Sequence, residues 1–322
     1  MPVTRDDVAR RAGVSTAVVS YVLNGGPRPV SQEKRERVLR AIAELGYRRD
    51  AVAAALSSRR SGTLGLLLPD GSNPFFADLA RRIEDLAFAR GYTVLVGNAA
   101  EDRAREARHL EAFMAHRVEG VIACLADVAA PLPDLIEQLG DRVVLVDRVP
   151  LGWSGRSVSV DNRHGGRLAA EHLTGTGRRR LAVLSGPAGF THVANRVGGF
   201  TAALPAGSTC DVAVAPSFDY ASGHAVMTEL LCDLRPDGVF CCSDALAIGA
   251  LSAIARAGRR VPDDVAVVGY DDVAQAAVTV PPLTTVAQPT DAMAERALAL
   301  LLDPAASPSP PLPPRLIVRE SA

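Results

Sequence analysis

From Thr63 onward, short apolar runs alternate with longer amphipathic segments, and this alternation limits the possible fold more than any other feature of the chain. The apolar runs have the length of buried strands, and the segments between them carry apolar residues at helical spacing. This pattern predicts α/β architecture, with parallel sheets flanked by helices on both faces. The expected strands span residues 64–68, 93–96, 120–124, 143–146, 181–184, 211–214, 238–242, 265–269 and 316–318.

The expected helices lie between these strands, near residues 75–90, 102–116, 132–139, 163–174, 192–204, 220–231 and 244–257. The strands fall into two sets, so we expect two similar lobes with a cleft between them. We place the first lobe at about 61–160 and 288–312, and the second at about 161–287 and 313–322. Because ligands of open parallel sheets bind outside the carboxyl ends of the strands, the cleft is the expected ligand site.

The first 46 residues follow a different pattern, which predicts three short helices. Gly13 separates the first two, Ser15 can cap the second, Ser31 can cap the third, and Gly46 follows its last turn. Two short helices joined by a glycine-containing turn and backed by a third form a helix-turn-helix. Residues 1–60 hold 12 of the 35 basic and 6 of the 36 acidic residues, so a basic head precedes an acidic body. This asymmetry predicts that residues 1–46 form a nucleic-acid-binding domain.

Residues 47–60 connect this head to the body, residues 61–322. Their composition favours a helix of about three turns with arginines on both sides. A helix of this length is marginal in water when it is isolated. We therefore expect a hinge helix that forms only when another group holds it.

Several function classes are disfavoured by what the chain lacks. It shows no apolar signal peptide and no run of 18 uncharged apolar residues, so we expect a cytoplasmic protein with no membrane partner. The five cysteines contain no C-x-x-C pair, which favours buried, reduced thiols. The histidines do not cluster at metal-ligand spacing, so no metal and no other cofactor is expected. The common phosphate-loop, zinc-protease and nucleophile-elbow motifs are missing, which argues against an enzyme.

Specific motifs follow one another along nearly the whole chain. In the first 60 residues they are VTRDDVARRAGVS (3–15), VSYVLNG (19–25), ERV (36–38), LGY (45–47) and AL (55–56). In the body they are SNPFF (72–76), VDR (146–148), VDN (160–162), Arg196 before Gly199-Phe200, SDALAIGA (243–250), VPDDV (261–265), VGYDD (268–272) and PLTTV (282–286). Their joint occurrence, in this order, closely resembles the lactose-repressor/galactose-repressor (LacI/GalR) family of transcriptional regulators, whose body is periplasmic-binding-protein-like.

The resemblance implies a homodimeric repressor that binds double-stranded DNA at a palindromic operator. In the family, the second helix enters the major groove, the hinge helices pair in the minor groove, and a leucine at the position of Leu56 wedges into a base step. A ligand that shifts one lobe against the other alters the hinge spacing, which makes the control allosteric. The candidate DNA-binding residues are Thr4, Ser15, Thr16, Ala17, Ser20, Tyr21, Asn24, Ala53 and Leu56.

The chain also departs from the family pattern where the family reads DNA. Tyr21 stands where many members have arginine, and Ala17 and Val18 replace polar residues. Arg49-Asp50 occupies the place of the usual Pro-Asn. The operator sequence therefore cannot be copied from better-known members.

The effector site is expected in the cleft. The resemblance assigns Arg196 to ligand hydroxyls or a carboxylate, and Phe218 to stacking on the ligand. Asp271 follows an apolar strand, so its carboxylate should point into the cleft, while Asn73 lies in a cleft loop but could equally cap the next helix. The Asp147-Arg148 pair could simply engage neighbouring groups. The candidate effector-binding residues are Asn73, Phe75, Phe76, Asp161, Arg196, Phe218, Ser243, Asp271 and Gln288.

A pocket with Arg, Asp, Asn and one stacking aromatic suits a polyol ring, so a sugar is the expected effector, with a nucleoside or purine as the alternative. Two other classes stay open. A periplasmic-type sugar-binding protein would have a signal peptide in place of the basic head. An enzyme acting on a sugar or nucleoside would show paired carboxylates, or a base and a nucleophile, in the cleft.

Overall fold

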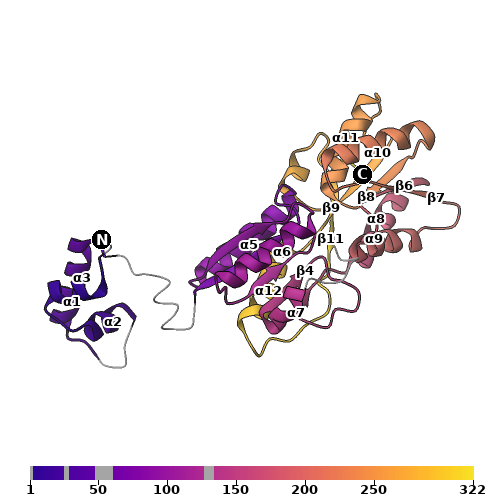
Figure 1. Ribbon diagram of the computed structural model, residues 1–322. Coiled ribbons are helices and arrows are strands. Elements are labelled where there is room, and N and C mark those ends of the chain that lie inside the picture. The colour runs from indigo at the N-terminus through magenta and orange to yellow at the C-terminus, as the bar shows by residue number, and fades with distance from the viewer. Residues whose placement is uncertain (1–2, 25–28, 48–60, 127–133) are drawn as a thin grey trace. The chain divides into compact units, whose positions relative to one another are not determined.

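A computed structural model describes residues 3–24, 29–47, 61–126 and 134–322 of the chain (Figure 1). The chain divides into two compact units, Met1–Ser61 and Gly62–Ala322, which we call the head and the body. The predicted hinge, with Ala53 and Leu56, lies outside the described residues.

The described part of the head contains three helices, α1 (Arg5–Ala12), α2 (Thr16–Asn24) and α3 (Gln32–Leu45). Thr4 begins α1 with a capping box, because its hydroxyl accepts a hydrogen bond from the Asp7 backbone N–H at 3.3 Å while its own N–H donates to the Asp7 carboxylate at 3.0 Å. One apolar face from each helix forms the core, which comprises Val8, Ala9, Ala12, Val19, Val22, Val38 and Ala41. The predicted helix-turn-helix is confirmed.

The turn between α1 and α2 depends on Gly13, whose φ of 63° is left-handed. The Arg37 guanidinium reaches from α3 to the end of α1 and donates to the carbonyls of Ala12 at 2.5 Å and Gly13 at 3.1 Å. Ser15 accepts a hydrogen bond from the Val18 N–H at 3.4 Å, as a cap should. Ser31 precedes α3 at the capping position, but its side chain forms no capping hydrogen bond.

The first lobe of the body is built on a parallel sheet of order β2-β1-β3-β4-β5. Its elements are β1 (Thr63–Leu68), α5 (Pro74–Ala89), β2 (Thr93–Asn98), α6 (Arg103–Ala115), β3 (Val121–Ala123), α7 (Asp134–Leu139), β4 (Val143–Val146), β5 (Ser157–Val158) and, much later in the chain, α12 (Thr290–Leu302). Helices α5 and α12 pack together on one face of this sheet, and α6 and α7 lie on the other.

The second lobe has a sheet of order β11-β10-β9-β8-β6-β7. Its elements are α8 (Asn162–Gly175), β6 (Arg180–Ser185), α9 (Thr191–Ala202), β7 (Thr209–Val214), α10 (Tyr220–Asp233), β8 (Gly238–Cys241), α11 (Asp244–Arg256), β9 (Ala266–Asp271), β10 (Thr284–Ala287) and β11 (Arg315–Ile317). Helices α8 and α9 cover one face and α10 and α11 the other, as Figure 1 shows. The predicted α/β architecture with two lobes is confirmed.

Two glycines allow α8 and α9 to cross at very short range. A side chain at Gly166 would overlap the backbone carbonyl of Arg196, and one at Gly199 would overlap the carbonyl of Arg163. The same contact brings Arg196 of α9 beside Asn162 at the start of α8.

The structure also differs from the sequence prediction in several places. Strands β5 and β10 and helix α12 were not anticipated, and β11 pairs antiparallel with β10 rather than parallel. The expectation of buried thiols holds for Cys124, Cys241 and Cys242, but Cys232 is exposed near the end of α10.

Candidate functional site

Eight of the nine predicted effector-binding residues line one cavity between the two lobes. The cavity measures about 20 Å³, which is room for about one water molecule. It is lined by the predicted Asn73, Phe75, Phe76, Arg196, Phe218, Ser243, Asp271 and Gln288, and also by Asp147, Arg148 and His192, which were not predicted.

These side chains meet because most of them follow the carboxyl ends of parallel strands. Asn73 comes after β1 and caps α5 by accepting a hydrogen bond from the Phe75 N–H at 3.0 Å. Ser243 comes after β8 and caps α11 through the Leu246 N–H at 3.2 Å. The capping alternative considered for Asn73 is thus realised without removing the residue from the cavity.

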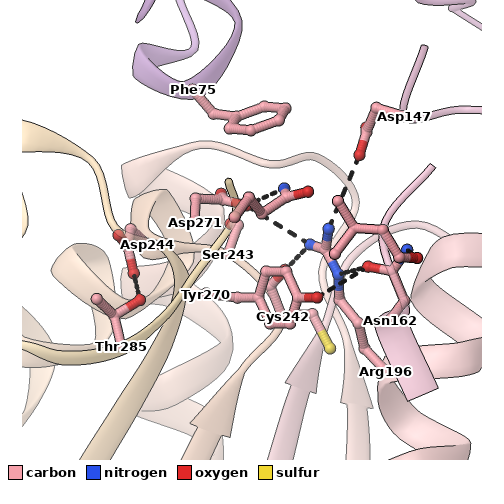
Figure 2. A network of polar contacts seen from close by, with 12 residues as sticks. Phe75, Asp147, Asn162, Arg196, Cys242, Ser243, Asp244, Tyr270, Asp271 and Thr285 are labelled. Carbon is pink, nitrogen blue, oxygen red and sulfur yellow. Dashed lines mark hydrogen bonds and ion pairs between the residues drawn. The ribbon is translucent and has the colours of Figure 1, made fainter. Parts of the chain in front are cut away.

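Arg196 is the centre of a buried polar network, shown in Figure 2. Its side chain is 3% exposed. Its Nε donates to Asn162 Oδ1 at 2.7 Å and its Nη1 to the Cys242 carbonyl at 2.7 Å. Its guanidinium also lies 3.6 Å from the centre of the Tyr270 ring. These contacts fix the guanidinium at the floor of the cavity.

Two carboxylates approach this guanidinium from different lobes. Asp271 Oδ1 at the end of β9 lies 3.8 Å from Nη1, and Asp147 Oδ1 after β4 lies 4.0 Å from Nη2 (Figure 2). The Asp147–Arg196 contact therefore spans the cleft. Burial raises the pKa of Asp147, an effect that Arg196 and Arg148 oppose.

Asp271 is held in an unusual backbone conformation, with φ of 118°, and such strain concentrates at functional sites. Its Oδ1 accepts a hydrogen bond from Gln288 Nε2 at 2.8 Å. Burial raises the pKa of Asp271 to about 7, although Arg196 and Gln288 favour the charged form. The buried Asp244 accepts from Thr285 Oγ1 at 2.6 Å, and its pKa is also raised, first by burial and then by Asp271. The site thus holds a carboxyl group that titrates near neutral pH.

Arg148 reaches from the first lobe to aromatic rings of the second. Glu101 holds its guanidinium through two hydrogen bonds of 2.7 Å each. The guanidinium lies 4.5 Å from the centre of the Phe190 ring and 5.8 Å from that of Phe218, while Phe76 of its own lobe lies at 5.2 Å. At these distances a cation attracts an aromatic face. Arg148 therefore joins the two lobes across the cavity.

Four buried polar atoms around this cavity form no hydrogen bond within the described part of the chain. They are Asp147 Oδ1, Arg148 Nε, His192 Nδ1 and Gln288 Oε1. Because buried polar atoms in proteins are almost always hydrogen-bonded, their gathering at one cavity indicates a site for a polar ligand.

Asp161 is the predicted effector-binding residue that the structure does not bring to the cavity. Its carboxylate accepts a hydrogen bond from the His164 N–H at 2.9 Å and caps α8, and its side chain is exposed. The next residue, Asn162, is the one whose side chain meets Arg196. Asp161 therefore lies outside the cavity that brings the other predicted effector-binding residues together.

In the head, the predicted DNA-contacting residues of α2 form one face. Thr16 and Ala17 are exposed, and Ser20 and Tyr21, about one turn later, are partly exposed. Val19 and Val22 point into the core instead. Ser15 and Thr4 are also exposed, each at a helix start, whereas the side chain of Asn24 is not among those described.

Known protein families match both the head and the body of this chain. Residues 4–50 match the family described as bacterial regulatory proteins, lacI family, and residues 170–322 match the periplasmic binding protein-like domain. The ribose operon repressor of Halalkalibacterium halodurans is 38% identical over 327 residues, which cover 98% of this chain and 96% of that protein. The chain belongs to the LacI family. This LacI-family protein is a DNA-binding transcriptional regulator.

Other relatives of this LacI-family regulator agree with the assignment. The HTH-type transcriptional repressor PurR of Mannheimia succiniciproducens is 34% identical, over 93% of this chain and 91% of that protein. The lac repressor dimer bound to operator and the anti-inducer ONPF superposes with a TM-score of 0.86 at 27% identity, over 100% of this chain and 99% of that one.

Over the residues that the structure describes, no helix is long and apolar enough to cross a membrane. The same residues bring together no group of three His, Cys, Asp or Glu side chains suited to a metal ion.

Proposed function

We propose that this LacI-family regulator is a cytoplasmic homodimeric repressor whose affinity for a palindromic operator is controlled by a sugar bound between the two lobes. The observation that carries the proposal is the set of buried polar atoms on Asp147, Arg148, His192 and Gln288 that form no hydrogen bond within the described residues. A sugar hydroxyl both donates and accepts hydrogen bonds, so a polyol can satisfy this mixture of donors and acceptors.

Ribose is the sugar we propose first. The names of the ribose operon repressors, which are among the relatives of this chain, support a pentose. The cavity also supports it, because Arg196 and Asp271 are charged groups suited to hydroxyls, and Phe75 and Phe218 offer flat apolar faces. A purine is the second candidate, favoured by the same two rings and by the PurR relative.

Control of DNA binding requires the effector to change the arrangement of the lobes. A cavity of about 20 Å³ is far smaller than the several hundred Å³ typical of small-molecule sites. Ligand entry must therefore alter contacts that cross the cleft, namely Asp147 with Arg196 and Arg148 with Phe190. A ligand that fits one lobe arrangement better than another shifts the population between them.

The shift between lobe arrangements acts on DNA binding through the hinge. Residues 47–60 lead directly into β1 of the first lobe, so movement of that lobe changes the spacing of the hinges in a dimer. We assign operator contact to the exposed face of α2, with Thr16, Ala17 and Tyr21, and to Leu56 of the hinge. The body binds its ligand without converting it.

A thermal-melt screen tests this function. D-ribose, other sugars, sugar phosphates, nucleosides and purines are added to the wild type and to Asp271→Ala, Arg196→Ala and Asp161→Ala. At 100 times its dissociation constant a ligand stabilises the protein by about 2.7 kcal/mol. We expect ribose to raise the melting temperature of the wild type and of Asp161→Ala, which lies outside the cavity, but not of the other two variants.

The same compounds are then tested for their effect on operator binding by fluorescence anisotropy, and for turnover by mass spectrometry. Ribose should change operator affinity and should be recovered unchanged. A shift produced by purines alone would replace the sugar with the second candidate. If no compound shifts the melt, metabolite sensing at this cavity is contradicted.

A further inference from the structure

We propose that His192 hydrogen-bonds a hydroxyl of the effector through Nδ1 and is a specificity-determining residue of the regulator. The proposal rests on the function proposed above and adds a residue that neither the sequence motifs nor the comparisons assign.

His192 lies at the cavity between the lobes. It lies one turn before Arg196 on α9, at the spacing that puts two side chains on the same helix face. Both side chains line the cavity. His192 is 6% exposed, and its Nδ1 has no hydrogen-bond partner within the described residues. A buried imidazole nitrogen is rarely left without a partner, so the ligand is the group that can supply one.

The ring of His192 is held in place by aromatic neighbours. Its centre lies 6.1 Å from that of Phe218 in a stacked arrangement, and 5.4 Å from that of Phe190. Phe190 in turn lies against the Arg148 guanidinium. The imidazole is therefore fixed by packing on its faces, which leaves its edge atoms for polar recognition.

Burial, together with the charges around it, keeps His192 neutral. Burial and the nearby Arg196 and Arg148 guanidinium groups lower its pKa well below the usual range. A neutral imidazole offers one N–H and one lone pair. A hydroxyl can donate to the lone pair or accept from the N–H, so it pairs with Nδ1 in either tautomer. The ionised side chains of the cavity can only donate or only accept, and His192 adds recognition of a hydroxyl without adding charge.

Three variants separate this hydrogen bond from packing. His192→Phe keeps a flat ring and removes Nδ1. His192→Asn places an amide atom where Nδ1 lies, and His192→Leu is close to Asn in size but cannot hydrogen-bond. Binding of D-ribose is measured by titration calorimetry on the full chain, with the melting temperature and operator affinity of each unliganded variant as controls for folding. We expect the Phe and Leu variants to bind ribose about 10-fold more weakly than the wild type, and the Asn variant to bind it nearly as tightly as the wild type.

Deoxy sugars then identify the contacted hydroxyl. The wild type and His192→Phe are titrated with 2-deoxy-, 3-deoxy- and 5-deoxy-D-ribose. The analogue that lacks the contacted hydroxyl should bind both proteins equally, while the other two should still show the full difference. Equal binding of D-ribose by the Asn and Leu variants would assign His192 to packing alone and overturn the inference.

The two proposals fail in different ways. If the wild type binds D-ribose and His192→Phe binds it equally well, the inference about His192 is wrong and the proposed function stands. If the wild type does not bind D-ribose at all, the proposed pentose effector is wrong, and the role of His192 in recognising it is wrong with it.

Discussion

Arg196 Nη1 lies 3.8 Å from Asp271 Oδ1 in the interior of the body, and both side chains are almost inaccessible to solvent. The pair joins α9 to the end of β9, and Asp147 approaches the same guanidinium from the other lobe. Buried ions are costly unless they are paired and hydrogen-bonded. The pairing therefore serves stability and leaves a charged floor on which a polar ligand can bind.

Replacing Arg196 should damage both folding and effector binding. Arg196→Met keeps much of the side-chain volume but removes the counter-ion of Asp271 and one of the two arginines that favour the charged form of Asp147. Breaking a buried ion pair in this way costs about 3–5 kcal/mol, which urea denaturation can measure. Arg167→Met is the control, because Arg167 pairs with Glu171 at the surface and should change stability by less than about 1 kcal/mol. Equal stability of the two variants would contradict the structural role of Arg196.

Effector affinity should depend on pH through Asp271, whose pKa burial raises to about 7. If the effector hydroxyl donates to the ionised carboxylate, the dissociation constant should be about 10-fold higher at pH 6 than above pH 8. The groups that face Asp271 are Arg196 from α9, Asp147 after β4, Asp244 from α11 and Gln288 after β10. Titration calorimetry from pH 5.5 to 8.5 checks the trend, and Asp271→Asn should bind weakly with little pH dependence. A wild-type dissociation constant that does not change over this pH range would contradict the prediction.

The free energy of unfolding should fall as the pH rises, whereas effector affinity should increase. The folded state holds the Asp271 proton more tightly than the unfolded chain, where the pKa has its ordinary value of 3.8. The stabilising contribution of this proton is complete below about pH 4 and is lost as the pH rises through about 7. The unfolding free energy of the wild type relative to Asp271→Asn should accordingly fall between pH 5 and 8.

The close crossing of α8 and α9 makes Gly166 sensitive to substitution. In Gly166→Ala the new methyl group would overlap the Arg196 carbonyl and the Phe200 N–H, both of which belong to the backbone. Forcing the helices apart should cost about 1–3 kcal/mol and move Arg196 away from Asn162. Gly175→Ala in the same helix meets nothing within 4 Å and should be neutral or slightly stabilising. Thermal unfolding and ribose titration of the two variants should therefore differ; matching results would show that the crossing tolerates a methyl group.

Glu101 should act on effector binding through Arg148. Glu101→Gln removes the charge that faces a guanidinium only 2% exposed and keeps one hydrogen bond of the pair. Losing a hydrogen bond to a charged group costs roughly 1.5–3 kcal/mol, so we expect reduced stability and weaker ribose binding. Glu171→Gln, at the exposed partner of Arg167, is the matched control. Unchanged ribose affinity in Glu101→Gln would show that Arg148 is held by its other contacts alone.

Substitutions that damage the head should reduce operator binding without changing ribose binding by the body. Gly13→Ala places a residue with a side chain in the left-handed conformation, which costs about 1–2 kcal/mol of stability. The new methyl group also displaces Arg37 from the carbonyls to which it donates. Gly46→Ala also occupies a left-handed position but meets nothing within 4 Å, so it should show the backbone cost alone. We expect the Gly13 variant to lose more operator affinity than the Gly46 variant, while ribose binding stays at the wild-type level in both. A loss of ribose binding in either would indicate that head and body do not fold separately.

Periodicity predicted most of the fold because each buried strand is a compact apolar run. Helix α12 escaped prediction because its sequence, TDAMAERALALLL, has few polar residues to mark an outer face, and it precedes a proline-rich stretch. Strand β10 was part of a motif, but its four residues include two buried threonines rather than an apolar run. The antiparallel pairing of β11 depends on the path of the chain after α12, which local sequence does not specify.

Sequence patterns predicted the residues of the cavity between the lobes where strand ends carry polar side chains, and predicted fewer of them elsewhere. Asp161 lies outside the cavity because adjacent residues at a helix start point in different directions: Asp161 caps α8, while the Asn162 side chain meets Arg196. Asp147 and Arg148 belonged to a recognised motif, but their contacts with Arg196 and Glu101 join distant segments. Nothing in the sequence around His192 indicates that its Nδ1 lacks a hydrogen-bond partner within the described residues.

The chain order of the body limits how it can recombine with relatives. Elements β1–β5 build the first lobe, α8–β10 the second, α12 returns to the first and β11 to the second. A single genetic crossover near residue 61 exchanges the head as a complete unit. The lobes cannot be exchanged in this way, because each is assembled from two separate stretches of the gene. One recombination event near residue 61 can therefore join a head to a different intact body, whereas a single crossover within the body would divide the segments that build one lobe.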